Sequence, residues 1–171
     1  MVRVDSKLPD GYRLISTAPA VIDHLMLRER AGLSPMGRRQ AEAGLRGSWT
    51  ACHVVRMNRA RETVAMGRII GDGGCFFQVV DMAVLPGHQR RGLGDAVLAH
   101  LLDRIRGAAP LGAYVSLLAD PPGRRLYAKH GFRETRTVVY RHGAATRLSG
   151  AARHSLIGHD PCGSCMELTR D

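Results

Sequence analysis

Apolar and polar positions along the chain follow two patterns, one typical of strands and the other typical of helices. Short apolar or alternating stretches between turn residues predict strands. They cover residues 11–17, 50–57, 62–70, 76–85, 114–119 and 132–140, with a last candidate at 164–170. Apolar residues spaced three and four apart predict helices. They cover residues 21–30, 34–44, 92–106 and 121–130, the second beginning at Ser34 and Pro35.

The order of these elements restricts the topology of the fold. The strands at 50–57, 62–70 and 76–85 are separated only by short turns, which predicts an antiparallel meander. The following stretch up to residue 119 contains a helix and then another strand. This βαβ order predicts two parallel strands joined by a right-handed crossover.

Length and composition are those of one globular domain. The chain has 171 residues, of which 44% are apolar, and we expect a single domain over residues 1–171. The Gly- and Arg-rich stretch near 141–163 is expected to be a loop or poorly ordered. The sequence contains no uncharged apolar run of about 18 residues, as a membrane span would require. Its first residues lack the apolar block of a signal peptide. We therefore expect a cytoplasmic protein with no membrane partner.

The formal net charge of +10 has two interpretations. Arginine carries nearly all of it, because Lys7 and Lys129 are the only lysines. Such a charge is typical of a protein that binds an anionic partner such as nucleic acid, or of an Arg-rich composition spread over the surface. The arginines are scattered, and no basic run is interleaved with the aromatic residues that single-strand binding favours. We therefore expect no nucleic-acid partner.

Cysteines and histidines raise the question of a metal site. Cys52 and Cys75 lie in apolar runs and are interpreted as small core residues. Four further candidate ligands lie within twelve residues of one another: His154, His159, Cys162 and Cys165. A zinc site is one interpretation, but one Cys-x-x-Cys pair in a Gly-rich stretch is more typical of a surface loop. We expect no metal.

The strongest chemical signal lies between the strand that ends near Pro86 and the helix that follows. A turn with two arginines and two glycines leads directly into that helix. The N–H groups of a helix's first turn have no partner within the helix, and with the helix dipole they favour an anion. Gly92 and Gly94 would let a phosphate approach the backbone, and Arg90 and Arg91 add positive charge. The turn predicts a pyrophosphate site; alternatively, the glycines only permit close packing.

Two motifs in this region resemble those of the GNAT (Gcn5-related N-acetyltransferase) family. Gln89-x-x-Gly92-x-Gly94, after a strand that ends in Ala83-Val84-Leu85-Pro86, is similar to the family's acetyl-CoA signature. Leu126-Tyr127-Ala128-Lys129-His130-Gly131-Phe132 resembles its Leu-Tyr-x-x-x-Gly-Phe element. The resemblance implies an α/β (α+β) GNAT fold, with a mixed central sheet of six or seven strands and about four helices. It also implies an N-acetyltransferase that uses acetyl-CoA.

The resemblance further implies where acetyl-CoA binds. The strands 76–85 and 114–119 would splay apart, the pantetheine arm would lie in the gap against the backbone amides of residues 82–85, and the turn 89–94 would hold the pyrophosphate. The cofactor-binding residues expected on this basis are Met82, Ala83, Val84, Gln89, Arg90, Arg91, Gly92, Leu93, Gly94, Asp120 and Tyr127. The chain departs from the family pattern at Asp120, where asparagine is common, and at Gly123, where alanine is common.

Two residues are candidates for the chemistry of transfer to an amine. The resemblance implies that Tyr127 is the acid at the leaving sulfur, because a phenol is neutral at pH 7 and can donate to a thiolate; alternatively, it is a core aromatic. Asp81 lies in an apolar strand, where desolvation could raise its pKa and make it a base; alternatively, it forms a structural ion pair. By resemblance, the amide of Met82 or Ala83 would stabilise the oxyanion.

The acceptor is not readable from the sequence beyond a primary amine of a small molecule or peptide, attacking directly in a ternary complex. In the family, the acceptor site is shaped by the helix pair that corresponds to residues 21–44 and by the late strands. One alternative function is a GNAT-fold module that binds acyl-CoA without catalysis. Another, suggested by charge alone, is a nucleic-acid-binding domain. A homodimer is the general expectation for a small enzyme.

Overall fold

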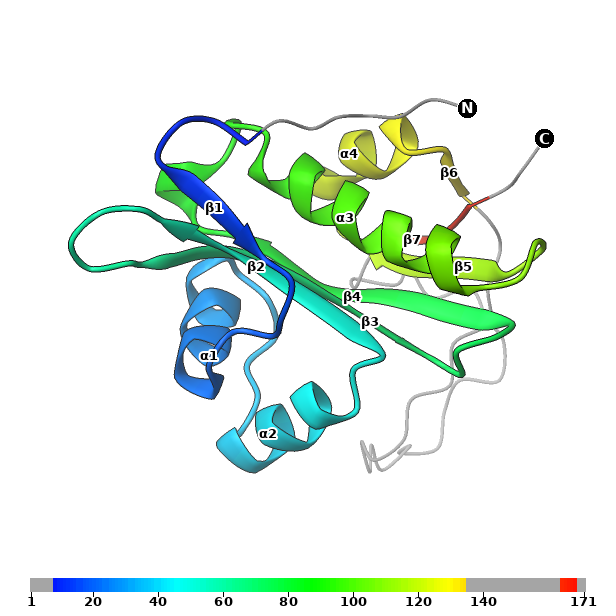
Figure 1. The fold of residues 1–171 in the computed structure, drawn as a ribbon, viewed down its shortest axis with the longest axis horizontal. Helices are drawn as coiled ribbons and strands as arrows, with labels where there is room; N and C mark the ends of the chain where they lie inside the picture. Colours follow the sequence, from blue (N-terminus) through cyan, green and yellow to red (C-terminus); the bar gives the residue numbers. More distant parts are fainter. Residues whose placement is uncertain (1–7, 135–163, 169–171) are drawn as a thin grey trace, which may run out of the picture.

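The computed structural model describes residues 8–134 and 164–168 of the chain. Within them, seven strands form one sheet in the order β1-β2-β3-β4-β5-β7-β6. The strands are β1 (Tyr12–Ile15), β2 (Thr50–Arg56), β3 (Thr63–Gly71), β4 (Phe76–Val84), β5 (Tyr114–Ala119), β6 (Phe132–Glu134) and β7 (Ser164–Leu168). The α-helices are α1 (Val21–Arg30), α2 (Arg38–Arg46), α3 (Leu93–Ala108) and α4 (Arg124–Lys129). This is the predicted mixed sheet with four flanking helices (Figure 1).

The topology agrees with the predicted element order. β1 to β4 pair antiparallel in succession, and β4 pairs parallel with β5 after the crossover through α3. β7 is later in sequence than β5 and β6 but lies between them in the sheet, antiparallel to both. The candidate strand at 164–170 therefore belongs to the sheet. The expected loop near 141–163, with its candidate metal ligands His154, His159 and Cys162, lies outside the described residues.

The helices cover both faces of the sheet. A Cβ on Gly67 would lie 2.7 Å from Cγ1 of Val97 in α3, whereas Arg68 donates a hydrogen bond of 2.9 Å to the carbonyl of Gly44 in α2. Neighbouring side chains of a strand point to opposite faces. Therefore α3 packs on one face and α2, with α1, on the other, and Figure 1 shows α3 across the front of the strands.

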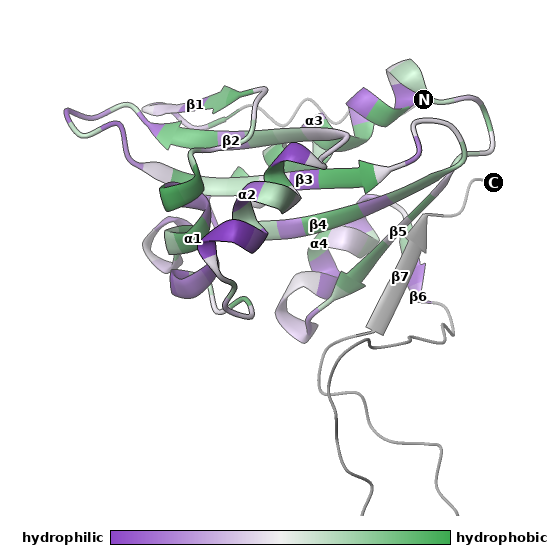
Figure 2. Cartoon of the chain, turned by 90° about the horizontal axis from the view of Figure 1, so that it is seen from below, coloured by the Kyte–Doolittle hydropathy of each residue, from purple (hydrophilic) through white to green (hydrophobic). Residues whose placement is uncertain are grey.

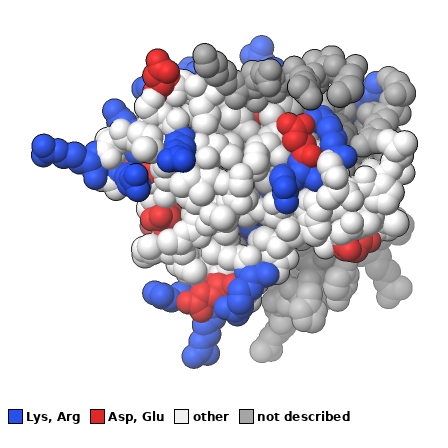
Figure 3. Space-filling view, in the orientation of Figure 1, with Lys and Arg blue, Asp and Glu red and all other residues white. Residues whose placement is uncertain are grey.

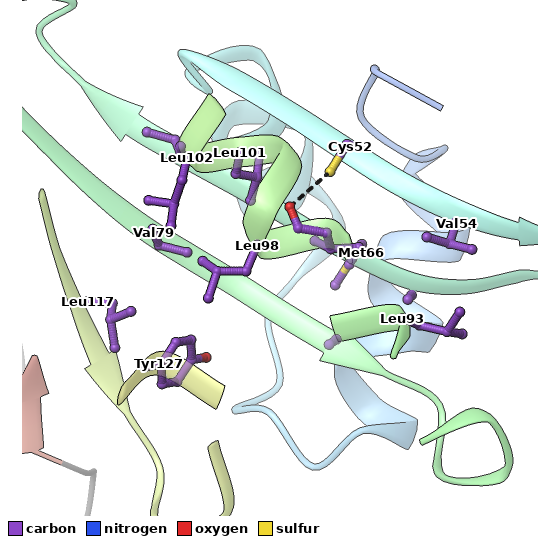
Figure 4. Packing of buried hydrophobic residues seen from close by; sticks show 14 of the residues in the cluster. Cys52, Val54, Met66, Val79, Leu93, Leu98, Leu101, Leu102, Leu117 and Tyr127 are labelled. Carbon is purple, nitrogen blue, oxygen red and sulfur yellow. Dashed lines mark hydrogen bonds between the residues drawn. The ribbon is translucent and has the colours of Figure 1, made fainter. Parts of the chain in front are cut away.

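The main core lies between α3 and the sheet (Figure 4). α3 buries one apolar stripe there, formed by Leu93, Val97, Leu98, Leu101, Leu102 and Ile105. Cys52 is fully buried beneath this helix, with its Sγ 3.8 Å from the carbonyl oxygen of Val97, and burial raises its pKa to about 12. By contrast, the prediction that Cys75 is a core residue is wrong. Cys75 is exposed in the turn before β4, where its N–H donates to the Asp72 carboxylate.

The second helix begins later than predicted. Its N-cap is Gly37 and not Ser34. The carbonyl of Ser34 instead accepts a hydrogen bond of 2.5 Å from Nη2 of Arg28, which holds the connection between α1 and α2 against the sheet. Ser34 therefore belongs to the connection before the helix, although its residue type is typical of an N-cap. Hydropathy mapped on the ribbon shows α2 as mostly hydrophilic and the central strands as mostly hydrophobic (Figure 2).

Positive charge is distributed over the visible face and does not form one continuous patch (Figure 3). Several basic side chains gather at the hairpin between β2 and β3, where Arg56, Arg59 and Arg61 are exposed. None of the helices in residues 8–134 combines the length and the apolar character that crossing a membrane requires.

Candidate active site

A β-bulge in β4 lies where the sheet opens. Met66 pairs with Ala83 and Arg68 with Val80, so Asp81 and Met82 together lie opposite Gly67. Asp81 takes the left-handed conformation, with φ of +55°. β4 pairs with β5 only from Phe76 to Val79, and beyond that point the two strands separate (Figure 2). A gap between the strands therefore begins next to the bulge, as the family resemblance implied.

The edge of β4 that faces this gap presents backbone groups. The N–H of Leu85 donates to the carbonyl of Val64 in β3 at 2.9 Å, so its expected contact with a cofactor arm is wrong. Because neighbouring N–H groups of a strand point to opposite sides, the amide of Val84 points away from β3, toward the gap. The carbonyl of Val84 accepts a hydrogen bond of 3.1 Å from Nε2 of Gln89, which connects the following loop to the end of β4.

The loop before α3 is shaped by left-handed residues. Arg90 and Gly92 have φ of +58° and +80°, and Gly92 is the N-cap of the helix. The first helical hydrogen bond there runs from the N–H of Ala96 to the carbonyl of Gly92. Among the described residues, the N–H groups of positions 92–95 have no backbone acceptor. They form a cluster of donors at the positive end of a 16-residue helix.

The two glycines of this loop serve different purposes. A Cβ on Gly92 would meet no atom within 4 Å, so glycine is required there by its positive φ. A Cβ on Gly94 would lie 3.3 Å from Cδ2 of Leu126 and 3.6 Å from Cγ2 of Val84. The packing interpretation therefore applies to Gly94, whereas Gly92 sets the direction of the backbone.

A hydrogen bond from the first strand supports the loop. The hydroxyl of Tyr12 lies 2.8 Å from Nδ1 of His88, and the two rings meet edge to face. Burial lowers the pKa of His88, and the nearby charges of Glu62 and Arg56 act in opposite directions on it. A neutral ring with an unprotonated Nδ1 can accept a hydrogen bond from the Tyr12 hydroxyl. Sequence reasoning missed this contact because 76 positions separate the two residues.

One cleft of about 760 Å³ joins the gap, the loop and the end of α1. Most of the predicted site residues line it: Asp81, Met82, Ala83, Val84, Gln89, Arg90, Gly92, Leu93, Gly94, Asp120 and Tyr127. Arg91 belongs to the same loop but does not line the cleft. Lining residues that were not singled out from the sequence as site residues include Ala31, Gly32, Leu33, His88, Asp95 and Leu118.

Tyr127 is both a packed aromatic and a lining residue of the cleft. It is 8% exposed, and its ring meets that of Phe132 edge to face with centroids 6.1 Å apart. Burial, with a smaller contribution from the Asp120 charge, raises the pKa of its phenol to about 12. A Cβ on Gly123 would lie 2.8 Å from Cε2 of Tyr127, which explains glycine at that position. Among the described residues, none of the hydrogen bonds uses the Tyr127 hydroxyl.

Asp81 forms a buried cluster that we call the Asp81 network, made of Asp81, His24, Arg28 and Arg68. Its carboxylate accepts a hydrogen bond from Nη1 of Arg28, one of 2.5 Å from Nε of Arg68 and one of 3.0 Å from Nε2 of His24. The Asp81 side chain is 8% exposed. The structure therefore gives Asp81 the ion pair that was the alternative interpretation.

The electrostatics of this network correct the expected pKa of Asp81. Burial alone would raise the pKa of this carboxyl, but the hydrogen bonds from His24 and Arg68 and the charges of Arg68 and Arg28 outweigh it. The pKa falls to about 2, so the expectation of a raised pKa is wrong. A carboxylate that binds a proton so weakly is a poor base for an ammonium group with a pKa of about 10.4.

The other carboxylates that line the cleft differ from each other. Asp95 accepts hydrogen bonds of 2.8 Å from Lys129 and 2.9 Å from His130, which link the start of α3 to the end of α4. Asp120 is exposed and forms no ion pair with any described residue. Within residues 8–134, no group of three or more His, Cys, Asp or Glu side chains is arranged to hold a metal ion.

Comparison with known proteins identifies the family. Residues 48–134 match the model of the acetyltransferase (GNAT) domain. The chain belongs to the GNAT acetyltransferase family. A Staphylococcus aureus protein described as a probable acetyltransferase is 32% identical, with a TM-score of 0.67. The match covers 84% of this chain and 98% of that protein.

More distant structures show the same GNAT fold. The ribosomal-protein-S18-alanine N-acetyltransferase of Escherichia coli is 18% identical, with a TM-score of 0.61 and 92% of each chain covered. Rv2747 of Mycobacterium tuberculosis, solved in complex with CoA and NLQ, is 16% identical, with a TM-score of 0.60 and 76% of each chain covered. No curated protein matches the sequence significantly.

Proposed function

We propose that this GNAT protein transfers an acetyl group from acetyl-CoA to a primary amine of a small molecule or peptide, by direct attack in a ternary complex. The observation that supports this most is the single cleft that joins the loop before α3, the open edge of β4 and Tyr127. Family membership supports acyl transfer in general. The bound acetyl-CoA would supply a thioester, which an unprotonated amine can attack.

The residues of the cleft fit acetyl-CoA in two separate ways. The donor cluster at positions 92–95, with Gln89, Arg90 and the nearby Arg91, suits a diphosphate, because backbone N–H groups at a helix N-terminus bind such anions. The edge of β4 that faces the gap, at Met82 and Val84, suits an extended arm with amide groups, which can pair with it as an added strand, whereas Ala83 pairs with Met66 of β3 and lines the cleft beside them. Leu93, Gly94 and Asp120 line the same space.

Tyr127 is proposed to act at the leaving sulfur. With a pKa of about 12 its phenol keeps its proton at neutral pH and remains a hydrogen-bond donor. Full proton transfer to a thiolate with a pKa near 8.5 would be uphill by about 5 kcal/mol. Tyr127 would therefore stabilise the developing thiolate mainly by donating a hydrogen bond, as donors preplaced in a dry site do.

The acceptor is proposed to enter beside residues 31–33, at the end of α1. Ala31, Gly32 and Leu33 line the same cleft as Asp81, and this wall is largely apolar. Two of the distant structural relatives carry names that specify amine acceptors. One is the Escherichia coli enzyme named for an alanine of a ribosomal protein, and the other is N-acetylglutamate synthase from Neisseria gonorrhoeae. Their low identities support the kind of reaction and not a particular acceptor.

A panel of amines tests the proposal directly. Purified protein is mixed with acetyl-CoA and amino acids, aralkylamines, polyamines or short peptides, and release of free CoA thiol is followed. CoA binding is measured in parallel by calorimetry. We expect thiol release that depends on one class of amine and a labelled acetyl group on the product nitrogen. CoA binding without turnover of any amine would favour the non-catalytic module.

A further inference from the structure

The Asp81 network connects parts of the chain that are far apart in sequence. Its carboxylate lies in the bulge of β4, while its partners come from α1 and β3. The two arginines also form hydrogen bonds outside the network. Arg28 donates one of 2.5 Å to the carbonyl of Ser34. Arg68 donates one of 2.9 Å to the carbonyl of Gly44 and one of 3.2 Å to the hydroxyl of Ser48. One carboxylate thereby holds both helices of the acceptor side against the sheet.

The residues held in this way include a wall of the cleft. Ala31, Gly32 and Leu33 line the cleft, and in sequence they lie between Arg28 and Ser34, which are joined by a hydrogen bond. Their backbone folds back on α1, since the N–H of Leu33 donates 2.9 Å to the carbonyl of Arg28 and that of Gly32 donates 3.2 Å to Glu29. The position of this wall therefore depends on where the Arg28 guanidinium is held.

Burial makes the network sensitive to loss of its anion. The side chains of His24, Arg28 and Arg68 are 2%, 10% and 12% exposed. Two guanidinium groups share the single carboxylate, and the Nε of Arg28 and the Nδ1 of His24 have no partner among the described residues. Removing one member of a buried ion pair leaves an uncompensated charge, which is strongly unfavourable. The segment bearing Arg28 would have to move to reach water.

We infer that Asp81 is a positioning residue that fixes the wall of residues 31–33 and thereby sets how tightly the acceptor amine is held. The inference rests on the proposed function, because it assigns that wall to the acceptor. The donor cluster before α3 is built from other residues, and no network contact reaches it. Loss of the Asp81 charge should therefore affect the acceptor and leave CoA binding intact.

The test variant is Asp81→Asn, which keeps the size of the side chain and tolerates the left-handed backbone. Steady-state kinetics with the best amine of the panel give kcat and KM, and calorimetry gives the Kd for CoA. We expect the acceptor KM to rise about tenfold, which corresponds to about 1.4 kcal/mol of lost binding, with kcat and the CoA Kd changed less than about threefold. The control is Asp103→Asn, which removes an exposed carboxylate paired with Arg106 and should change neither constant.

Two kinetic outcomes would overturn the inference. A fall in kcat of about a hundredfold with an unchanged acceptor KM would assign Asp81 to the chemical step. Unchanged kcat and KM would mean that the network does not position the wall. If Asp81→Asn fails to fold, Arg28→Lys takes its place, because an ammonium cannot span Asp81 and Ser34 as the guanidinium does. The same two outcomes in that variant would then contradict the inference.

A second readout separates this inference from the proposed function. Hydrogen exchange of the amides of Gly32 and Leu33 is measured in the wild type and in Asp81→Asn, with the amides of α3 as internal reference. Faster exchange confined to the α1 end supports the inference even if no amine is acetylated, in which case only the proposed function fails. Unchanged exchange at these amides contradicts the inference, whatever the outcome of the amine panel.

Discussion

The two ends of the cleft are built in different ways. The loop before α3 is continuous in sequence, its donors belong to the backbone, and its shape depends on Arg90 and Gly92 in left-handed conformations. The wall at residues 31–33 depends instead on side chains from α1, β3 and β4 that meet at one buried carboxylate. A site of the first kind follows from a short motif. A site of the second kind exists only once distant segments have packed, so its residues can change without disturbing the first.

Tyr127 lines the same cleft and gives the largest expected effect. In Tyr127→Phe, we expect kcat to fall about a hundredfold with the CoA Kd unchanged, because one preplaced donor to the thiolate is lost. The rate of thiol release gives kcat, and calorimetry gives the Kd for CoA. The ring packing against Phe132 is retained in this variant, so the melting temperature should stay close to that of the wild type. An unchanged kcat would show that Tyr127 serves packing alone.

The pH dependence of stability tests the acceptor end. Because the pKa of Asp81 is lowered from 3.8 to about 2 on folding, the network stabilises the folded state above pH 4 and loses this contribution as the pH falls through 2. The contribution at neutral pH is about 2 kcal/mol. The difference in free energy of unfolding between wild type and Asp81→Asn should be constant from pH 8 to 5 and shrink below pH 4. An acidic limb of kcat near pH 6 that this variant abolishes would contradict a lowered pKa.

The cofactor end has a matched pair of glycines for comparison. Gly92→Ala should weaken CoA binding about tenfold, because a residue with a Cβ loses about 1–2 kcal/mol at a positive φ. Gly87→Ala is the control, since it lies in the same loop, has no positive φ, and its Cβ would also meet no atom within 4 Å. Equal Kd values for the two variants would show that the left-handed turn does not organise the donors. The acceptor KM should be unchanged in both.

The smallest effect is expected at Asp120. Its charge contributes to the raised pKa of Tyr127, so Asp120→Asn should lower that pKa by less than about one unit. Ultraviolet titration of phenolate, with Tyr127→Phe as the reference for the other tyrosines, measures it. A raised pKa in this variant would contradict the proximity of the two groups in the cleft.

Several features of the site could be predicted from the sequence because they are local. The donors of the loop follow from Gln89, Gly92 and Gly94 ahead of an apolar helical stripe, and the βαβ order predicted the parallel pair that opens beside them. Some local signals were nevertheless misleading. Ser34 has the residue type of an N-cap, but its carbonyl accepts Arg28 and the helix begins at Arg38. Cys75 lies next to apolar residues but belongs to an exposed turn.

Asp81 illustrates what sequence reasoning could and could not supply. A carboxylate in an apolar strand indicates that a partner or a function is needed, and the sequence alone does not decide between a base and an ion pair. Its partners His24, Arg28 and Arg68 are separated from it in sequence by 57, 53 and 13 residues, respectively. His24 and Arg28 are four residues apart and therefore share one face of a helix, which indicates that they can bind the same group. No local pattern identifies that group as Asp81.

The sequence by itself determined the family, the fold class and the place of the anion-binding loop, because these depend on hydrophobic periodicity and on backbone geometry within a few residues. The tertiary structure decided the charge state of Asp81, the support of His88 by Tyr12 and the wall of residues 31–33. These depend on which side chains meet after folding, and a pKa in particular is set by the burial and the charges around a group rather than by its neighbours along the chain.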